Sequence, residues 1–141
     1  MGYDLFGLEP KSARGRYFRN NIWFWHRLWD FVCEISKDIL TEDEKRRGHF
    51  NEGLEIDKER TETIARRLQE ALLQKDLYEE QIAERAGKVG TGHQQLAQVV
   101  QKICAKIGAE FEPRNCTQRF SWGNVREFAV FCQECGGFRI C

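Results

Sequence analysis

Residues 22–35 read IWFWHRLWDFVCEI, and ten of these fourteen side chains are apolar. The run follows Asn20 and Asn21, and an asparagine can accept a hydrogen bond from the first free amides of a helix. We therefore predict a helix over about 22–40. Because each large apolar side chain left in water forfeits about 1.5–3 kcal/mol, a helix that is apolar on nearly every side must be covered on nearly every side.

Two interpretations of this helix stay open. It is the central core helix, which the usual burial of aromatic residues favours, or part of its aromatic surface is open to a protein partner or a second copy of the chain. In the second case its anchors are expected to be the residue types that dominate binding at protein interfaces. The partner-binding candidates of the sequence are Tyr17, Arg19, Trp23, Trp25 and Trp29.

The remaining chain predicts more helix than strand. A short aromatic run over 2–8 indicates an opening strand, and residues 11–20 have the composition of a surface loop. Thr41 and Glu44 have the spacing of a capping box for a short helix that Gly48 would end. Apolar stripes at helical spacing predict amphipathic helices over about 57–85, 92–107 and 122–135, and a last strand over 138–141.

Charge and length exclude several classes of protein. The chain has 141 residues with 22 basic and 22 acidic side chains, so it lacks the basic surplus of a non-specific nucleic-acid binder. The neutrality is a cancellation, because residues 34–85 hold ten bases and fifteen acids between two mildly basic ends. The first fifteen positions hold four charged residues where a secretory signal would be apolar, and the longest apolar run is too short for a bilayer. We expect a cytoplasmic protein with no membrane partner.

The six cysteines suggest a zinc site at the C-terminal end. Four thiolates can close a tetrahedral site, and the candidate ligands are Cys116, Cys132, Cys135 and Cys141. The spacing gives only one close pair, however, and Cys132 and Cys135 share a helical face with apolar residues. Packing as small apolar side chains is the favoured interpretation. We expect no cofactor, and zinc is the only alternative that the sequence suggests.

Two polar segments offer alternatives. The Gly48–Gly53 segment carries His49, Asn51 and Glu52, which could serve acid–base chemistry or could cap a glycine-bounded turn. The segment Arg14–Arg19 interleaves basic and aromatic residues, as single-stranded nucleic-acid sites do, but the neutral chain favours a solvated loop. No phosphate loop, nucleophile elbow or zincin pattern is present, so the sequence favours a protein that is not an enzyme.

Both ends of the chain resemble a known family. The residues that carry the likeness are GYDLFG at 2–7, YFRNN at 17–21, the tryptophans of the aromatic run, GHFN at 48–51, NVREF at 124–128 and GGFRIC at 136–141. They are similar to small uncharacterised proteins of bacteriophages, prophages and bacteria. The resemblance covers about half of the chain and implies a viral or mobile-element context without an established activity. It also favours a scaffold in which the first and last strands pair over the aromatic helix.

These observations give one prediction of fold and one of function. We predict a single α+β domain over 1–141, mostly helical, with a small antiparallel sheet formed by the termini and the 110–120 segment. We expect a non-enzymatic protein-interaction or self-associating module. The alternatives are a zinc-stabilised module that uses the C-terminal cysteines, and a small enzyme or nucleic-acid binder that uses His49 and Glu52 or the Arg14–Arg19 segment.

Overall fold

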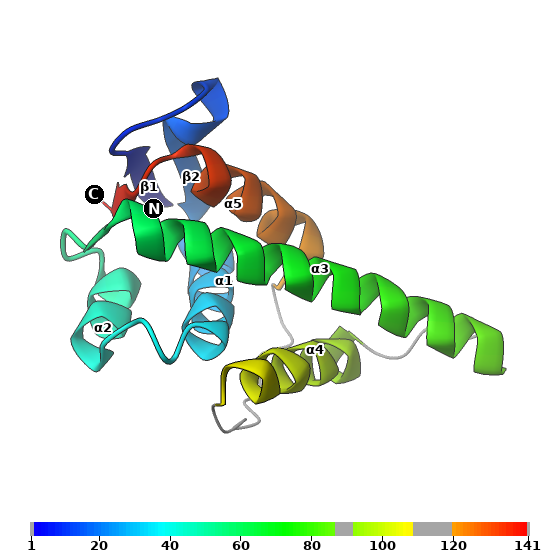
Figure 1. The fold of residues 1–141 in the computed structure, drawn as a ribbon. Helices are drawn as coiled ribbons and strands as arrows, with labels where there is room; N and C mark the ends of the chain where they lie inside the picture. The colour runs from blue at the N-terminus through cyan, green and yellow to red at the C-terminus, as the bar shows by residue number, and fades with distance from the viewer. Residues whose placement is uncertain (1, 87–91, 109–119, 141) are drawn as a thin grey trace.

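A computed structural model describes residues 2–86, 92–108 and 120–140 (Figure 1). The chain is α+β: its described residues form five α-helices, a 3-10 turn and four short strands. In order they are β1 (Gly2–Gly7), η1 (Ala13–Gly15), β2 (Tyr17–Asn21), α1 (Ile22–Ile35), α2 (Glu42–Phe50), β3 (Glu55–Ile56), α3 (Lys58–Ala86), α4 (Gly92–Ile107), α5 (Trp122–Glu134) and β4 (Phe138–Ile140). None of the described helices combines the length and apolar composition that a bilayer-spanning segment requires.

The strands form one antiparallel sheet in the order β2-β1-β4-β3. Leu5 of β1 pairs with Ile140 of β4, so the predicted pairing of the first and last strands is confirmed. Two of the strands differ from the prediction. Residues 17–20, expected in a loop, form an edge strand together with Asn21, because all five positions pair with β1, and residues 55–56 add a strand beside β4. A further strand was predicted at 110–120. Residues 110–119 lie outside the part of the chain that the structure describes.

Helix α1 is the central helix that the aromatic run predicts. Asn21 caps its start by accepting a hydrogen bond from the amide of Phe24 at 3.0 Å, as the sequence indicates. The helix ends at Ile35, earlier than expected. The backbone leaves helical geometry at Ser36, and Arg67 of α3 stabilises this end by donating a hydrogen bond to the free carbonyl of Ile35 at 3.0 Å and pairing with Asp38 in the following turn.

Helix α2 runs past the glycine that was expected to end it. The capping box of Thr41 and Glu44 is present, but the helix continues through Gly48 to Phe50 and ends at Asn51, whose φ is 55°. Gly48 lies against the indole of Trp29, where a Cβ atom would be 2.2 Å from Cε2. Its glycine therefore permits close packing inside the helix and does not terminate it.

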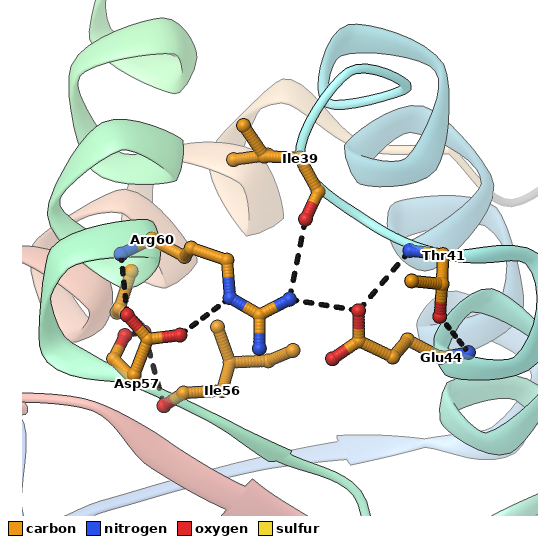
Figure 2. Close-up of polar contacts among 7 residues, drawn as sticks. Ile39, Thr41, Glu44, Ile56, Asp57 and Arg60 are labelled. Carbon is orange, nitrogen blue, oxygen red and sulfur yellow. Dashed lines mark hydrogen bonds and ion pairs between the residues drawn. The ribbon is translucent and has the colours of Figure 1, made fainter.

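Arg60, in the first turn of α3, ties together three segments (Figure 2). Its guanidinium donates hydrogen bonds to Glu44 of α2 at 2.7 Å and to the carbonyl of Ile39 at 3.2 Å, and it pairs with Asp57 next to its own helix. These hydrogen bonds lower the pKa values of Glu44 and Asp57. The N-terminal end of α2 is thus fixed to α3 by charged groups.

The long helix α3 spans the molecule, and its C-terminal end extends past the other helices (Figure 1). Its predicted stripe is confirmed, because Ile64, Leu68 and Ala71 are fully buried, and α5 packs along the same helix. Helix α4 packs against α1 and α3 with the stripe expected for it. The buried apolar side chains of these helices and of the inner sheet face form one continuous core.

Candidate functional site

The outward-pointing side chains of the four strands form a surface that we call the outer face. Alternation places Asp4 and Phe6 of β1 beside Arg19 and Tyr17 of β2, while the residues between them point into the core. Phe6 also pairs with Arg139 of β4, which pairs in turn with a residue of β3. One row therefore crosses all four strands of the sheet, in the order Tyr17, Phe6, Arg139, Glu55.

Two aromatic rings form the centre of one half of this face. The rings of Phe6 and Tyr17 have centroids 5.3 Å apart, and the two residues are 45% and 46% exposed. The hydroxyl of Tyr17 donates a hydrogen bond to Asp4, which raises the pKa of the phenol. Arg19 lies 3.8 Å from the same carboxylate. An exposed aromatic pair is thus held in place by hydrogen-bonded charged neighbours.

The structure divides the five partner-binding candidates into two groups. Tyr17 and Arg19 lie on the outer face, and Trp23, two residues after β2, is 62% exposed at the start of α1. Trp25 and Trp29 are fully buried. Their side chains offer a partner no surface on the folded chain. For these two residues α1 is the core helix of the first interpretation.

The buried tryptophans attach α2 to α1. Their rings stack with centroids 5.4 Å apart, and each indole N–H donates to a backbone carbonyl of α2. Trp25 binds the carbonyl of Gly48 at 2.9 Å, and Trp29 binds that of Lys45 at 2.8 Å. Tyr3 of β1 donates from its hydroxyl to the carbonyl of His49. The part of α2 from Lys45 to His49 is therefore held by hydrogen bonds to three of its carbonyls.

A histidine pair joins the same two helices. His49 does not lie in a loop, as the sequence suggested, but in the last turn of α2. Its Nε2 is 2.9 Å from the Asp30 carboxylate, and its Nδ1 is 3.0 Å from Nδ1 of His26. Glu52 points elsewhere, to an ion pair with Arg46 at 2.8 Å. His49 and Glu52 are not brought together, so the acid–base pair expected from the sequence is not formed.

A cleft of about 540 Å³ between α1 and α2 is lined by Asp30 and His49. Its charged side chains form ion pairs with one another or with close neighbours, among them Glu34 with Lys37 at 3.0 Å and Glu42 with Lys45 at 2.7 Å. Both ring nitrogens of His49 are engaged. The arrangement can hold a proton and pass it between imidazoles, but His49 keeps no nitrogen for a substrate.

The segment Arg14–Arg19 does not form a continuous basic and aromatic surface. Phe18 points into the core, where its ring lies 5.2 Å from Phe128, while Tyr17 and Arg19 face outward. Arg14 and Arg16 are exposed around η1. The interleaving in the sequence therefore reflects strand alternation, and one of its two aromatic rings is buried.

The cysteine candidates for zinc are only partly described. Cys132 and Cys135 are buried, and the thiol of Cys135 donates to the carbonyl of Cys132 at 3.6 Å. Burial raises the pKa of both thiols, that of Cys135 to about 11, which disfavours the thiolate that zinc requires. Within the described residues no cluster of three or more His, Cys, Asp or Glu side chains could hold a metal ion. Cys116 and Cys141 lie outside them.

Sequence reasoning missed three of the residues that shape these sites. His26 and Asp30 are four apart on α1, and that spacing alone places them on one helix face. Phe6 follows from the alternation of the opening strand. What the sequence does not indicate is the distant partner of each group.

Comparisons with known proteins identify no relative of this chain. No family model matches the chain, no curated protein matches it, and no solved structure matches it. The functional argument therefore rests on the residues themselves.

Proposed function

We propose that this chain is a non-enzymatic interaction module that associates with a second copy of itself through the outer face. The observation that carries the proposal is the exposed aromatic pair of Phe6 and Tyr17, fixed in orientation by Asp4 and Arg19 on a sheet face that none of the described helices covers. Rigid aromatic and arginine side chains are the residues that most often carry binding energy.

The charges of the outer face favour a second copy as its occupant. Two acids and two bases lie on it, so two copies can meet without net repulsion, and the whole chain is neutral as well. The four charged residues are Asp4, Arg19, Glu55 and Arg139. When the row across the strands is laid antiparallel on itself, Phe6 meets Arg139 of the other copy, which is a favourable cation–π pairing.

The sheet is small, so the association is expected to be weak. Its strands have six, five, three and two residues, and a stable interface needs about 800 Å² from each partner. The exposed Trp23 adjoins β2 and can extend the contact. We expect a dimer that is populated only at high protein concentration.

The biological setting is a further part of the proposal. It rests on the resemblance of the two ends to small proteins of bacteriophages, prophages and bacteria. In that setting the protein works in the cytoplasm, inside the host cell if a phage encodes it. A different protein partner would use the same outer face.

Sedimentation velocity over a concentration series tests self-association. The wild-type chain should shift toward a dimer as its concentration rises, and Phe6→Ser or Arg19→Glu should weaken the dimer at least tenfold. Leu73→Ser is the matched control, since Leu73 is an exposed apolar residue of α3, outside the sheet. It should leave the dimer unchanged.

Three results would overturn self-association. The first is a wild-type chain that stays monomeric at every concentration. The second is a dimer that Leu73→Ser disrupts and Phe6→Ser does not. A photo-reactive residue at position 17 that crosslinks one other protein, and not a second copy, would also reject the second copy as the occupant.

A further inference from the structure

The contact between His26 and His49 leaves room for one proton only. The two Nδ1 atoms are 3.0 Å apart and the ring centroids 5.3 Å. The distance between the centroids is about the distance between the nitrogens plus the two distances from centroid to nitrogen within the rings. Both nitrogens therefore lie close to the line that joins the centroids. Such head-on geometry suits one N–H donating to one lone pair.

The partner of Nε2 fixes the direction of that hydrogen bond. Asp30 accepts from Nε2–H of His49 at 2.9 Å, so neutral His49 has its lone pair on Nδ1. His26 must then donate from its own Nδ1–H. A first added proton leaves one N–H between the two Nδ1 atoms, since it either goes to Nε2 of His26 or goes to Nδ1 of His49 while His26 accepts on its own Nδ1. A second added proton puts an N–H on both Nδ1 atoms, and the two N–H groups then face one another.

We propose that His26, His49 and Asp30 form a proton-controlled latch between α1 and α2. With no more than one added proton the latch is closed. The second proton places two N–H groups head to head and adds a second positive charge, so the rings separate. The part of α2 from Lys45 onward then leaves Trp25 and Trp29, whose indole hydrogen bonds end on the carbonyls of Gly48 and Lys45.

The surroundings favour opening in mild acid. Burial, and then the charge of protonated His49, lower the pKa of His26 in the closed form. The opened, solvated imidazole recovers the ordinary pKa near 6.5. The closed state is thus fully favoured above about pH 6.5 and loses stability as the pH falls below it, because the open state binds more protons.

Charged or titratable groups of α1, β1 and α2 surround this pair. Helix α1 contributes Asp30, which favours the protonated forms, and Arg27, which opposes them and lies 3.7 Å from Asp30. Strand β1 contributes Tyr3, whose ring edge faces His26 and whose pKa is raised by burial. The other charged side chains of the cleft are in ion pairs, and they are Glu34, Lys37, Glu42, Lys45 and Arg46.

The opposite end of α2 stays attached under the same conditions. Arg60 holds Glu44 and Asp57, and its hydrogen bonds keep the pKa values of both carboxyls below their ordinary range near 4. These groups remain ionised at pH 5. Acid therefore releases the histidine end of α2 while its N-terminal end stays bound to α3.

The test follows the indole N–H signals of Trp25 and Trp29 in the ¹⁵N NMR spectrum of the full chain between pH 7.5 and 5.0. Both should lose protection against hydrogen exchange together, while the backbone amides of β1 and α5 keep theirs. The opening equilibrium should rise by up to about tenfold per pH unit for each proton taken up.

His26→Asn separates the latch from general acid sensitivity. An asparagine amide can donate to or accept from Nδ1 of His49, so no head-on conflict arises and the transition should disappear. His49→Gln keeps a donor for Asp30, lacks the second imidazole and should also abolish the transition. His93→Asn, at the third histidine of the chain, is the control and should leave the transition unchanged.

Three results would overturn the latch. The indole signals of Trp25 and Trp29 could keep their protection to pH 5. The transition could persist with the same midpoint in both His26→Asn and His49→Gln. Finally, all amides could lose protection together, which would indicate global unfolding and not release of one helix end.

Discussion

Gly48 shows how one missing side chain permits the contact between α1 and α2. A Cβ atom at this position would lie 2.2 Å from Cε2 of Trp29 and 2.4 Å from two further ring atoms. We predict that Gly48→Ala lowers the free energy of unfolding by about 1–3 kcal/mol, because the indole or the helix must move. That loss outweighs the gain of up to about 1 kcal/mol in helix propensity. Urea unfolding followed by tryptophan fluorescence measures the change.

Gly123 provides the matched comparison for Gly48. It also lies in a helix, and the nearest atom to its added Cβ would be Oγ of Ser121 at 3.5 Å, an ordinary contact. Gly123→Ala should therefore raise the free energy of unfolding by about 0.5–1 kcal/mol. Opposite signs for the two variants would support the packing argument, and a loss of equal size in both would contradict it.

The sequence predicted the elements better than it predicted their ends. The aromatic run and its asparagine cap located α1, and helical stripes located α3, α4 and α5. The errors at Ile35 and Gly48 have one cause, since each depends on a group far away in the chain. Arg67 binds the last carbonyl of α1, and the ring of Trp29 requires a glycine inside α2.

The candidate sites show the same division between local and distant information. Residue type is local information, so Tyr17 and Arg19 could be chosen as partner-binding candidates in a segment expected to be a loop, while the strand alternation that places both on the outer face was not predicted. Burial of Trp25 depends on which helix covers α1, and a side-chain pair such as His26 with His49 depends on two helices meeting. Periodicity reports the face of one element and not its neighbour.

The attachment of α2 to α3 gives a prediction at the scale of elements. Arg60→Met removes the donor to Glu44 and to the carbonyl of Ile39, and we expect it to cost about 1–2 kcal/mol, since both acceptors are partly buried. Because Arg60 lowers the pKa of Glu44, the stability from this pair is present above about pH 4 and is lost as the pH falls through the lowered value.

The pH dependence of unfolding separates this attachment from a general loss of charge. The free energy of unfolding, measured with urea, should fall less between pH 5 and pH 3 in Arg60→Met than in the wild-type chain. Arg66→Met is the control, since Arg66 donates to Thr63 of its own helix and should change little. Equal acid sensitivity in wild type and Arg60→Met would contradict the role given to Glu44.

At the scale of the whole molecule, β4 at the C-terminal end lies between the N-terminal strand β1 and the strand β3 from the middle of the chain. This strand pairs with β1 on one side and with β3 on the other, and Phe138 lies fully buried within it. The ring of Phe138 lies 5.9 Å from that of Phe128 and 6.1 Å from that of Phe131, both on α5. The last strand is therefore part of the core and not an appendage to it.

Phe138→Ala should accordingly destabilise the entire chain. We expect a loss of about 3–5 kcal/mol in one cooperative transition, because the cavity opens where the sheet meets α5. Circular dichroism and tryptophan fluorescence should give the same lowered urea midpoint, since helices and core unfold together. Arg139→Ala, one residue along and exposed on the outer face, should lower the free energy of unfolding by no more than about 0.5 kcal/mol. If Phe138→Ala frayed only the last strand and kept the wild-type midpoint, β4 would not be the element that joins the ends of the chain.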